Sequence, residues 1–236
     1  MTGAAGGIGG DLSRALAGRG AKVAVTDTDE AGIAKIAAEL STFGTVMDVA
    51  KERSVREVVS RVCGELGPLD MLFNVAGIIE GHFPLQDMPM ETFDLVFSVN
   101  MRGMLVTTQA VARSMIAEGR KGVITNVGSN AGLNVGADRF AYGISKMGVH
   151  ALTRAAAKGF APYGIRVNAV APGPVYTPMS RAVMDDPEGR AAWEARIPLH
   201  RIADTNDVVD VMLFLASDRA KNMTGAIVST DGGSSA

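Results

Sequence analysis

The chain has 236 residues, of which 47% are hydrophobic and 20% charged, and its formal net charge is −2. This size suits one generous domain, and the charge excludes the basic footprint of a nucleic-acid or membrane-surface protein. The single cysteine, Cys63, excludes an intrachain disulfide and favours a reducing, cytoplasmic location. His82, His150 and His200 lack metal-ligand spacing, and no apolar run has the length of a membrane span. We therefore expect no metal, no nucleic acid and no membrane partner.

Strand-like and helix-like segments alternate along the whole chain. Short runs rich in Val and Ile, typical of strands buried on both faces of a parallel sheet, cover 21–26, 44–47, 69–74, 122–127, 165–170 and 226–228. Apolar residues recur at helical spacing over 8–18, 29–40, 54–66, 91–117, 140–160 and 206–216. Since the chain has no repeat and no linker, residues 1–236 are predicted to form one α/β domain. Its expected form is a Rossmann-like doubly wound parallel sheet with helices on both faces.

A glycine-rich turn opens the chain, where residues 2–9 read TGAAGGIG ahead of a predicted helix. Glycines let a backbone approach a pyrophosphate, whose charge then meets the helix N-terminus. Asp27 ends the strand that follows, and a carboxylate there can accept hydrogen bonds from an adenosine ribose and repel a 2′-phosphate. The alternatives are a tight turn without a ligand and an acid that only caps a helix.

A hydroxyl, a phenol and an ammonium form a second candidate group. Tyr142 and Lys146 are four residues apart, so they lie on one face of the predicted helix 140–160. An ammonium one turn away favours the phenolate, so we expect Lys146 to lower the pKa of Tyr142. Ser129 follows the strand 122–127, where its hydroxyl can reach the same space. The three groups suit carbonyl/alcohol interconversion, although a Tyr–Lys pair on a solvated helix face also occurs by chance.

Together these motifs resemble the short-chain dehydrogenase/reductase family, in its single-domain form, over almost the whole chain. The resemblance implies that Gly3, Gly7, Ile8 and Gly9 bind the cofactor phosphates and that Asp27 binds the ribose. It places the rest of the cofactor on Asp48, Val49, Asn74, Ala76, Gly77, Tyr142, Lys146, Pro172, Gly173, Val175 and Thr177.

The resemblance also implies the catalytic roles. Tyr142 would be the general acid/base, and Lys146 would lower its pKa and hold the nicotinamide ribose. Ser129 would hydrogen-bond the substrate carbonyl, and Asn100 would hold a water that links Lys146 to solvent. Hydride transfer is the chemistry of the cofactor. A homotetramer or homodimer, formed through the helices that carry Asn100 and Tyr142, is expected by the same analogy.

The expected function is an NAD-dependent oxidoreductase that interconverts a small secondary alcohol and a ketone. NAD is favoured because Gly6 and Thr28 stand where members of the family that use NADP carry basic residues. One alternative is an enzyme similar to a 3-oxoacyl-carrier-protein reductase, a reaction that usually goes with NADP. Another is a non-catalytic NAD(H)-sensing protein, which would not need Ser129, Tyr142 and Lys146 together. The loops 78–89, 133–139 and 179–200, the last a lid in the family, determine the substrate, which the sequence leaves open.

Two features depart from the family pattern. Val75 replaces the second asparagine of the motif at 74–77, with little loss expected. More seriously, the glycine turn follows a central strand in the family, whereas only Met1 precedes Thr2 here. Without that strand its neighbours would keep unpaired backbone groups in the interior. We expect the natural protein to begin roughly six to twelve residues upstream, the length of one strand and its lead-in; the alternative is an inactive, poorly folding form.

Overall fold

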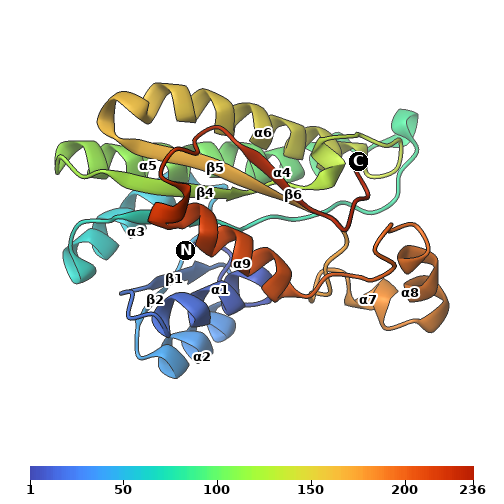
Figure 1. The fold of residues 1–236 in the computed structure, drawn as a ribbon, viewed down its shortest axis with the longest axis horizontal. Helices are drawn as coiled ribbons and strands as arrows, with labels where there is room; N and C mark the ends of the chain where they lie inside the picture. The colour runs from blue at the N-terminus through green and yellow to red at the C-terminus, as the bar shows by residue number, and fades with distance from the viewer.

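Strands and helices alternate in the structure as the sequence predicts (Figure 1). The computed structural model describes residues 1–236. All strand pairs are parallel, with β1 beside β2 and the other four in the order β3-β4-β5-β6. The strands are β1 (Ala24–Asp27), β2 (Phe43–Val46), β3 (Met71–Asn74), β4 (Gly122–Val127), β5 (Ile165–Pro172) and β6 (Ile227–Thr230). The predicted α/β class is confirmed, and each predicted strand overlaps an observed one.

The α-helices are α1 (Gly7–Ala17), α2 (Glu30–Leu40), α3 (Glu52–Leu66), α4 (Met90–Phe97), α5 (Met104–Ala117), α6 (Phe140–Phe160), α7 (Arg181–Met184), α8 (Pro187–Glu194) and α9 (Thr205–Ala216). Short 3-10 turns cover Leu85–Asp87, Asn130–Gly132, Ala161–Tyr163 and Asp218–Ala220. The one long helix predicted over 91–117 is instead divided by a π-helical stretch, η2 (Ser98–Gly103), which contains Asn100. Such stretches are rare and frequent at functional sites, and the helical period alone does not reveal them.

The sheet separates two apolar cores. On one face, Phe73, Val127 and Val170 pack with residues of α1, α2 and α9. On the other face, side chains at the alternate positions of the strands, such as Leu72 and Ile124, pack with α5 and α6. This division follows from the alternation of side chains along a strand. Figure 1 shows the two helical layers above and below the sheet, with α5 and α6 on one side and α1, α2 and α9 on the other.

Between β1 and β3 the sheet is held together by the first residues of the chain. Thr2 bridges Thr26 on β1 and Asn74 on β3 in parallel register. The Met1 α-amine donates to Ala24 O at 3.0 Å, and the Thr2 N–H donates to Phe73 O at 3.0 Å. Burial lowers the pKa of this amine to about 6. The central position of the sheet is therefore occupied only at its carboxyl end.

Ahead of Met1 the same position is a slot between β1 and β3. It forms a cavity of about 400 Å³, lined mainly by apolar side chains of β1, β3, α3 and α5, including Val23, Val62 and Leu72. This slot is what the sequence predicts for a doubly wound sheet that lacks most of its first strand.

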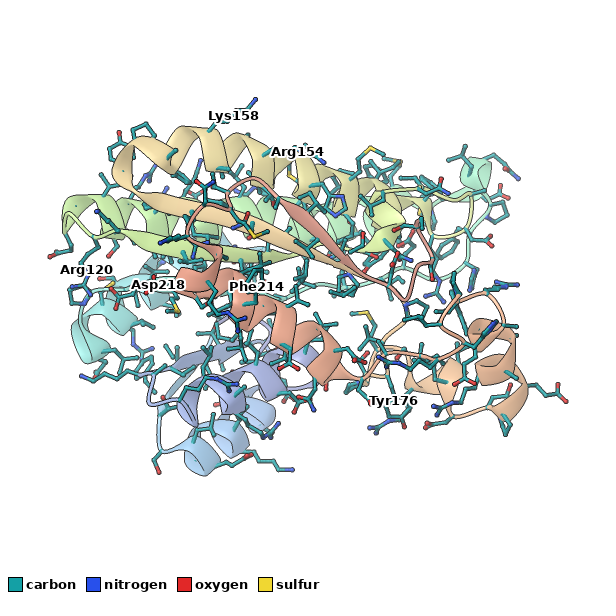
Figure 2. All side chains as sticks on the ribbon, viewed as in Figure 1. Arg120, Arg154, Lys158, Tyr176, Phe214 and Asp218 are labelled. Carbon is teal, nitrogen blue, oxygen red and sulfur yellow. The ribbon has the colours of Figure 1, made fainter.

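The segment after β5 forms two short helices that project from the sheet at one end (Figure 1). The Tyr176 hydroxyl, labelled in Figure 2 beside this segment, donates to Asp185 Oδ1 at 2.7 Å just after α7. The Asp186 carboxylate caps α8 by accepting from Gly189 N at 2.8 Å. Trp193 on α8 is 39% exposed. The region 179–200, which the family resemblance suggests is a lid, thus contains two helices and is hydrogen-bonded to the loop that follows β5.

No helix of the chain is both long and apolar enough to cross a bilayer.

Candidate active site

The glycine turn lies at the carboxyl ends of β1 and β3. Helix α1 begins at Gly7, and its N-cap residue Gly6 has no side chain to satisfy the first amides. Free amides at a helix N-terminus favour an anion such as a pyrophosphate. Gly3 has φ +67°, and a Cβ there would lie 2.6 Å from Ala76 N, while a Cβ on Gly9 would overlap the Gly3 carbonyl. Glycine is therefore required at both positions for the turn to pack against the end of β3.

Thr2 joins the glycine turn to the loop after β3. Its hydroxyl accepts from the amides of Val75 and Ala76 at 3.0 and 3.1 Å. The preceding Asn74 is buried, and its side-chain amide donates to Asn126 Oδ1 at 2.9 Å. The Asn74 side chain therefore locks β3 to β4 and leaves the backbone of residues 75–77 to face the turn. The sequence did not single out the Thr2 hydroxyl.

Asp27 ends β1 beside the turn. Its carboxylate accepts from Ala5 N at 3.1 Å and from Thr28 N at 2.7 Å. Helix α2 is capped by Asp29 instead, which accepts from Gly32 N at 3.0 Å. Asp27 is therefore not the N-cap of α2: its Oδ2 faces the glycine turn, and its Oδ1 accepts from the amides of Thr28 and Asp29.

Two further predicted cofactor residues follow β2. Asp48 accepts from Ala50 N at 3.0 Å and pairs with Lys51 at 3.2 Å, so its carboxylate is held in place at the end of the strand. Val49 is buried and packs closely against Gly103 of the π-helical stretch. This contact positions the Asp48 loop beside the segment that carries Asn100.

Ser129, Tyr142 and Lys146 meet at the carboxyl end of β4. The Lys146 ammonium is buried, donates to Val127 O at 2.8 Å and lies 5.5 Å from the centre of the Tyr142 ring. The Ser129 hydroxyl is close enough to the phenol to lower its pKa by hydrogen bonding. The predicted one-face arrangement of Tyr142 and Lys146 on α6 is therefore observed, with Ser129 opposite them.

The pKa of Tyr142 is raised, contrary to the direction expected from the sequence. Burial of the phenol is the largest cause, and the charge of Glu80 adds to it, while the Ser129 hydroxyl and Arg139 oppose it. Burial also lowers the pKa of Lys146 to about 8, because a buried ammonium loses its hydration. Spacing along a helix places Lys146 near the ring, but the groups that lower the pKa of the phenol are Ser129 and Arg139, and burial outweighs both.

Asn100, in the π-helical stretch η2, lies beside Lys146 of α6. Its side-chain amide donates to Ile78 O at 2.8 Å and to Ser145 Oγ at 3.0 Å, and its oxygen accepts from Ile78 N at 2.8 Å. A Cβ at Gly77 would be 3.3 Å from both Asn100 Oδ1 and Lys146 Nζ, so the two side chains converge on this glycine. Asn100 thus fastens the loop after β3 to α6.

The loop after β5 closes over the turn. Gly173, which follows Pro172 at the end of β5, packs against the backbone of Asp231, and Val175 bridges Ala203. A Cβ at Gly7 would be 3.5 Å from the Thr177 side chain, so this loop and the glycine turn face each other. The predicted cofactor residues therefore gather at one edge of the sheet.

Glu80 is the site residue that the sequence did not indicate. It is only 5% exposed, and both carboxylate oxygens lie 3.1 Å from the backbone N of Tyr142. A lone acid in a predicted loop carries no such signal. One signal in the sequence could have indicated an outside acceptor: Arg139, ahead of the helix 140–160, cannot cap its N-terminus.

A parallel sheet whose strand ends present a glycine turn, an acidic residue and a Ser–Tyr–Lys group defines a dinucleotide-dependent oxidoreductase. Comparison with known proteins agrees. A family model described as enoyl-(acyl carrier protein) reductase matches residues 3–235. L-xylulose reductase of Bos taurus is 38% identical over 234 residues, covering 99% of this chain and 94% of that protein. Cis-4-hydroxycyclohexanecarboxylate dehydrogenase of Sinomonas cyclohexanicum is 39% identical over 238 residues, with coverages of 99% and 94%.

Solved structures share the fold of this chain. The solved structure of a short-chain type dehydrogenase/reductase from Mycobacterium marinum has a TM-score of 0.93 and 34% sequence identity, covering 99% of this chain and 93% of that one. The chain belongs to the short-chain dehydrogenase/reductase family. It is an NAD(P)-dependent oxidoreductase that acts on CH–OH groups and interconverts an alcohol and a ketone.

Proposed function

We propose that the chain is an NAD-dependent dehydrogenase or reductase in which Tyr142 is the general acid/base. The observation that carries this proposal is the meeting of Tyr142, Ser129 and Lys146 beside the glycine turn. In carbonyl reduction, the Ser129 O–H donates to the substrate oxygen and the Tyr142 O–H delivers the proton that completes the alcohol; oxidation reverses both steps. The nicotinamide supplies or accepts the hydride when bound.

Lys146 and Asn100 complete the proposed machinery. With a pKa near 8, the buried ammonium can exchange a proton close to neutral pH and replace the proton that Tyr142 transfers. Asn100 holds the backbone of Ile78 beside Lys146, where a water can continue the path to solvent. Asp27 and Asp48 hold the cofactor through their carboxylates, and the remaining site residues between Gly3 and Thr177 hold it by backbone and shape.

NAD rather than NADP is supported by Asp27. Its Oδ1 accepts from the amides of Thr28 and Asp29, whereas its Oδ2 accepts only from Ala5 N and retains a lone pair that can accept from a ribose hydroxyl. The same charge would repel a 2′-phosphate, and neither Gly6 nor Thr28 offers a cation to compensate. A 3-oxoacyl-carrier-protein reductase-like activity, which usually goes with NADP, is the second candidate, favoured by a relative of that name in Thermotoga maritima that is 36% identical over 238 residues.

The proposed substrate is a small secondary alcohol or its ketone, with further hydroxyl groups or a ring. This class is supported by the names of the relatives, a sugar reductase and a dehydrogenase of a hydroxylated cyclohexane acid.

We also propose an oligomer formed through α4 and α6, because Leu95, Ile144 and Met147 are exposed apolar residues on these helices. A cytoplasmic location is proposed from the free thiol of Cys63.

The test is a panel of polyols, cyclic alcohols and their ketones, read by nicotinamide absorbance with NAD and with NADP. We expect turnover with at least one secondary alcohol and a higher kcat/KM with NAD. Tyr142→Phe should lower kcat by about 10³-fold or more while leaving NADH affinity within a few-fold, because the phenyl ring keeps its place. Substantial turnover by this variant, or binding of NADH without any turnover by the unaltered chain, would overturn the proposal and, in the second case, favour a sensor.

A further inference from the structure

Helix α6, which carries both Tyr142 and Lys146, has no N-cap of its own. Arg139 stands at the cap position with φ +55°, a left-handed conformation, and its side chain does not cap the helix. The first turn contains no acidic residue. The first amides of a helix need acceptors when they are buried, so something outside the helix must supply one.

Glu80 supplies this acceptor from the loop after β3. Its two carboxylate oxygens are each 3.1 Å from Tyr142 N, in the first turn of α6, although the residues are 62 apart in sequence. The side chain is 95% buried and forms no ion pair with a lysine or arginine. Burying an unpaired carboxylate is costly, so the amide and the positive end of the helix dipole are what keep it there.

We propose that Glu80 is a positioning residue for the reaction, which caps α6 through the backbone amide of Tyr142 and thereby holds the phenol opposite Ser129. This inference rests on the proposed role of Tyr142. It also connects the loop 78–89, one of those expected to determine the substrate, to the general acid/base, so that a displacement of the loop is transmitted to the phenol through one carboxylate.

The charge of Glu80 has a second effect on the phenol. The groups that face Tyr142 are Glu80 from the loop after β3, Arg139 at the start of α6 with its hydrogen-bonded partner His82, Lys146 one turn further along α6 and the Ser129 hydroxyl from the end of β4. Glu80 raises the pKa of Tyr142 and Arg139 lowers it. Removing one charge or the other should therefore move the pH dependence of alcohol oxidation in opposite directions.

The test compares four variants of the full chain. Glu80→Gln keeps an acceptor oxygen and the side-chain volume but removes the charge, and Glu80→Ala removes both. Arg139→Gln removes the opposing charge, and Glu65→Gln, at an exposed position on α3, is the matched control. Rates of alcohol oxidation are measured from pH 6 to 10, and hydrogen exchange is followed by mass spectrometry in peptides that cover residues 140–146.

We expect the midpoint of the pH–rate curve to move to lower pH in Glu80→Gln and to higher pH in Arg139→Gln, and to stay in place in Glu65→Gln. In Glu80→Ala, exchange in the first turn of α6 should be about fivefold to tenfold faster, the effect of a lost cap, and kcat should fall by about tenfold with NADH affinity retained. If Glu80→Ala does not fold, the pH–rate curve of Glu80→Gln, which keeps the side-chain volume and an acceptor oxygen, tests the proposal.

An unmoved pH curve in Glu80→Gln would overturn the proposal, and so would unchanged exchange in Glu80→Ala. Faster exchange without any change in kcat or pH midpoint would make Glu80 a structural cap only, which also rejects the positioning role. If the unaltered chain turns over no alcohol, the proposed function fails instead. Ultraviolet titration of the Tyr142 phenol, taken as the difference between each chain and its Tyr142→Phe form, then still reports whether Glu80 acts on the phenol.

Discussion

The slot ahead of Met1 gives a quantitative prediction. In a parallel sheet, the N–H and C=O of one residue both point to one neighbouring strand, and those of the next residue point to the strand on the other side. Because Met1 and Thr2 bond to Ala24 O, Thr26 N and Phe73 O, Ala24 on β1 and Phe73 on β3 face the slot. An extended segment of five residues joined ahead of Met1, such as Ser-Val-Ala-Ile-Val, would run parallel to both strands and enter the cavity of about 400 Å³.

The size of the effect follows from the groups that the segment would bury. The two valines and the isoleucine contribute about 1.5 kcal/mol each and the alanine methyl about 0.8 kcal/mol, and about five new main-chain hydrogen bonds contribute about 1 kcal/mol each. Ordering five residues costs about 1.5 kcal/mol each. The net gain in the free energy of unfolding is therefore about 3 kcal/mol, since the gains exceed the entropy cost. For a chain of this size that raises the melting temperature by about 6 to 12 °C.

The assay is thermal unfolding followed by circular dichroism, with a segment of the same length, Ser-Gly-Ser-Gly-Ser, as the control. Glycine and serine cannot fill the apolar slot, so the control should melt close to the unextended chain. Equal melting temperatures for the two segments would refute the reasoning.

The Met1 amine offers an independent check on the same site. Its pKa is about 6 in the folded chain and 8.0 when exposed, so the unfolded state binds more protons between these values. The free energy of unfolding of the unextended chain should therefore rise as the pH rises from 6 to 8. Either segment converts this amine to an amide, and the contribution should disappear from both extended forms.

Two further predictions concern packing and acid stability. Gly9→Ala should gain about 1 kcal/mol of helix propensity but lose more, because its Cβ overlaps the Gly3 carbonyl; we expect a lower melting temperature and weaker NADH binding, whereas Gly64→Ala, with open space around its Cβ, should be neutral or stabilising. Burial lowers the pKa of His150 to about 4, so protonation in the unfolded state alone should reduce stability as the pH falls from 6.5 towards 4. Urea unfolding of His150→Gln over that range should show a weaker pH dependence, and curves parallel to those of the unaltered chain would contradict this.

The sequence by itself determined the fold class and most of the cofactor edge. The runs of Val and Ile placed all six strands, and the period of 3.6 placed α6 with Tyr142 and Lys146 on one face. These predictions succeed because side-chain periodicity and glycine turns are local consequences of backbone geometry. The expectation of unpaired strand edges beside the glycine turn agrees with the slot between β1 and β3, since each strand in a sheet interior needs partners on both sides.

Tertiary structure alone decided the electrostatics of the site. The sequence indicates that Lys146 is near Tyr142, but the direction of the phenol's pKa shift depends on how deeply the ring is buried and on Glu80, which reaches it from another loop. The π-helical stretch likewise contacts distant residues, Ile78 through Asn100 and Val49 through Gly103, that helical periodicity does not indicate. Desolvation and long-range hydrogen bonds are properties of the packed chain, because they join residues whose separation in sequence carries no pattern.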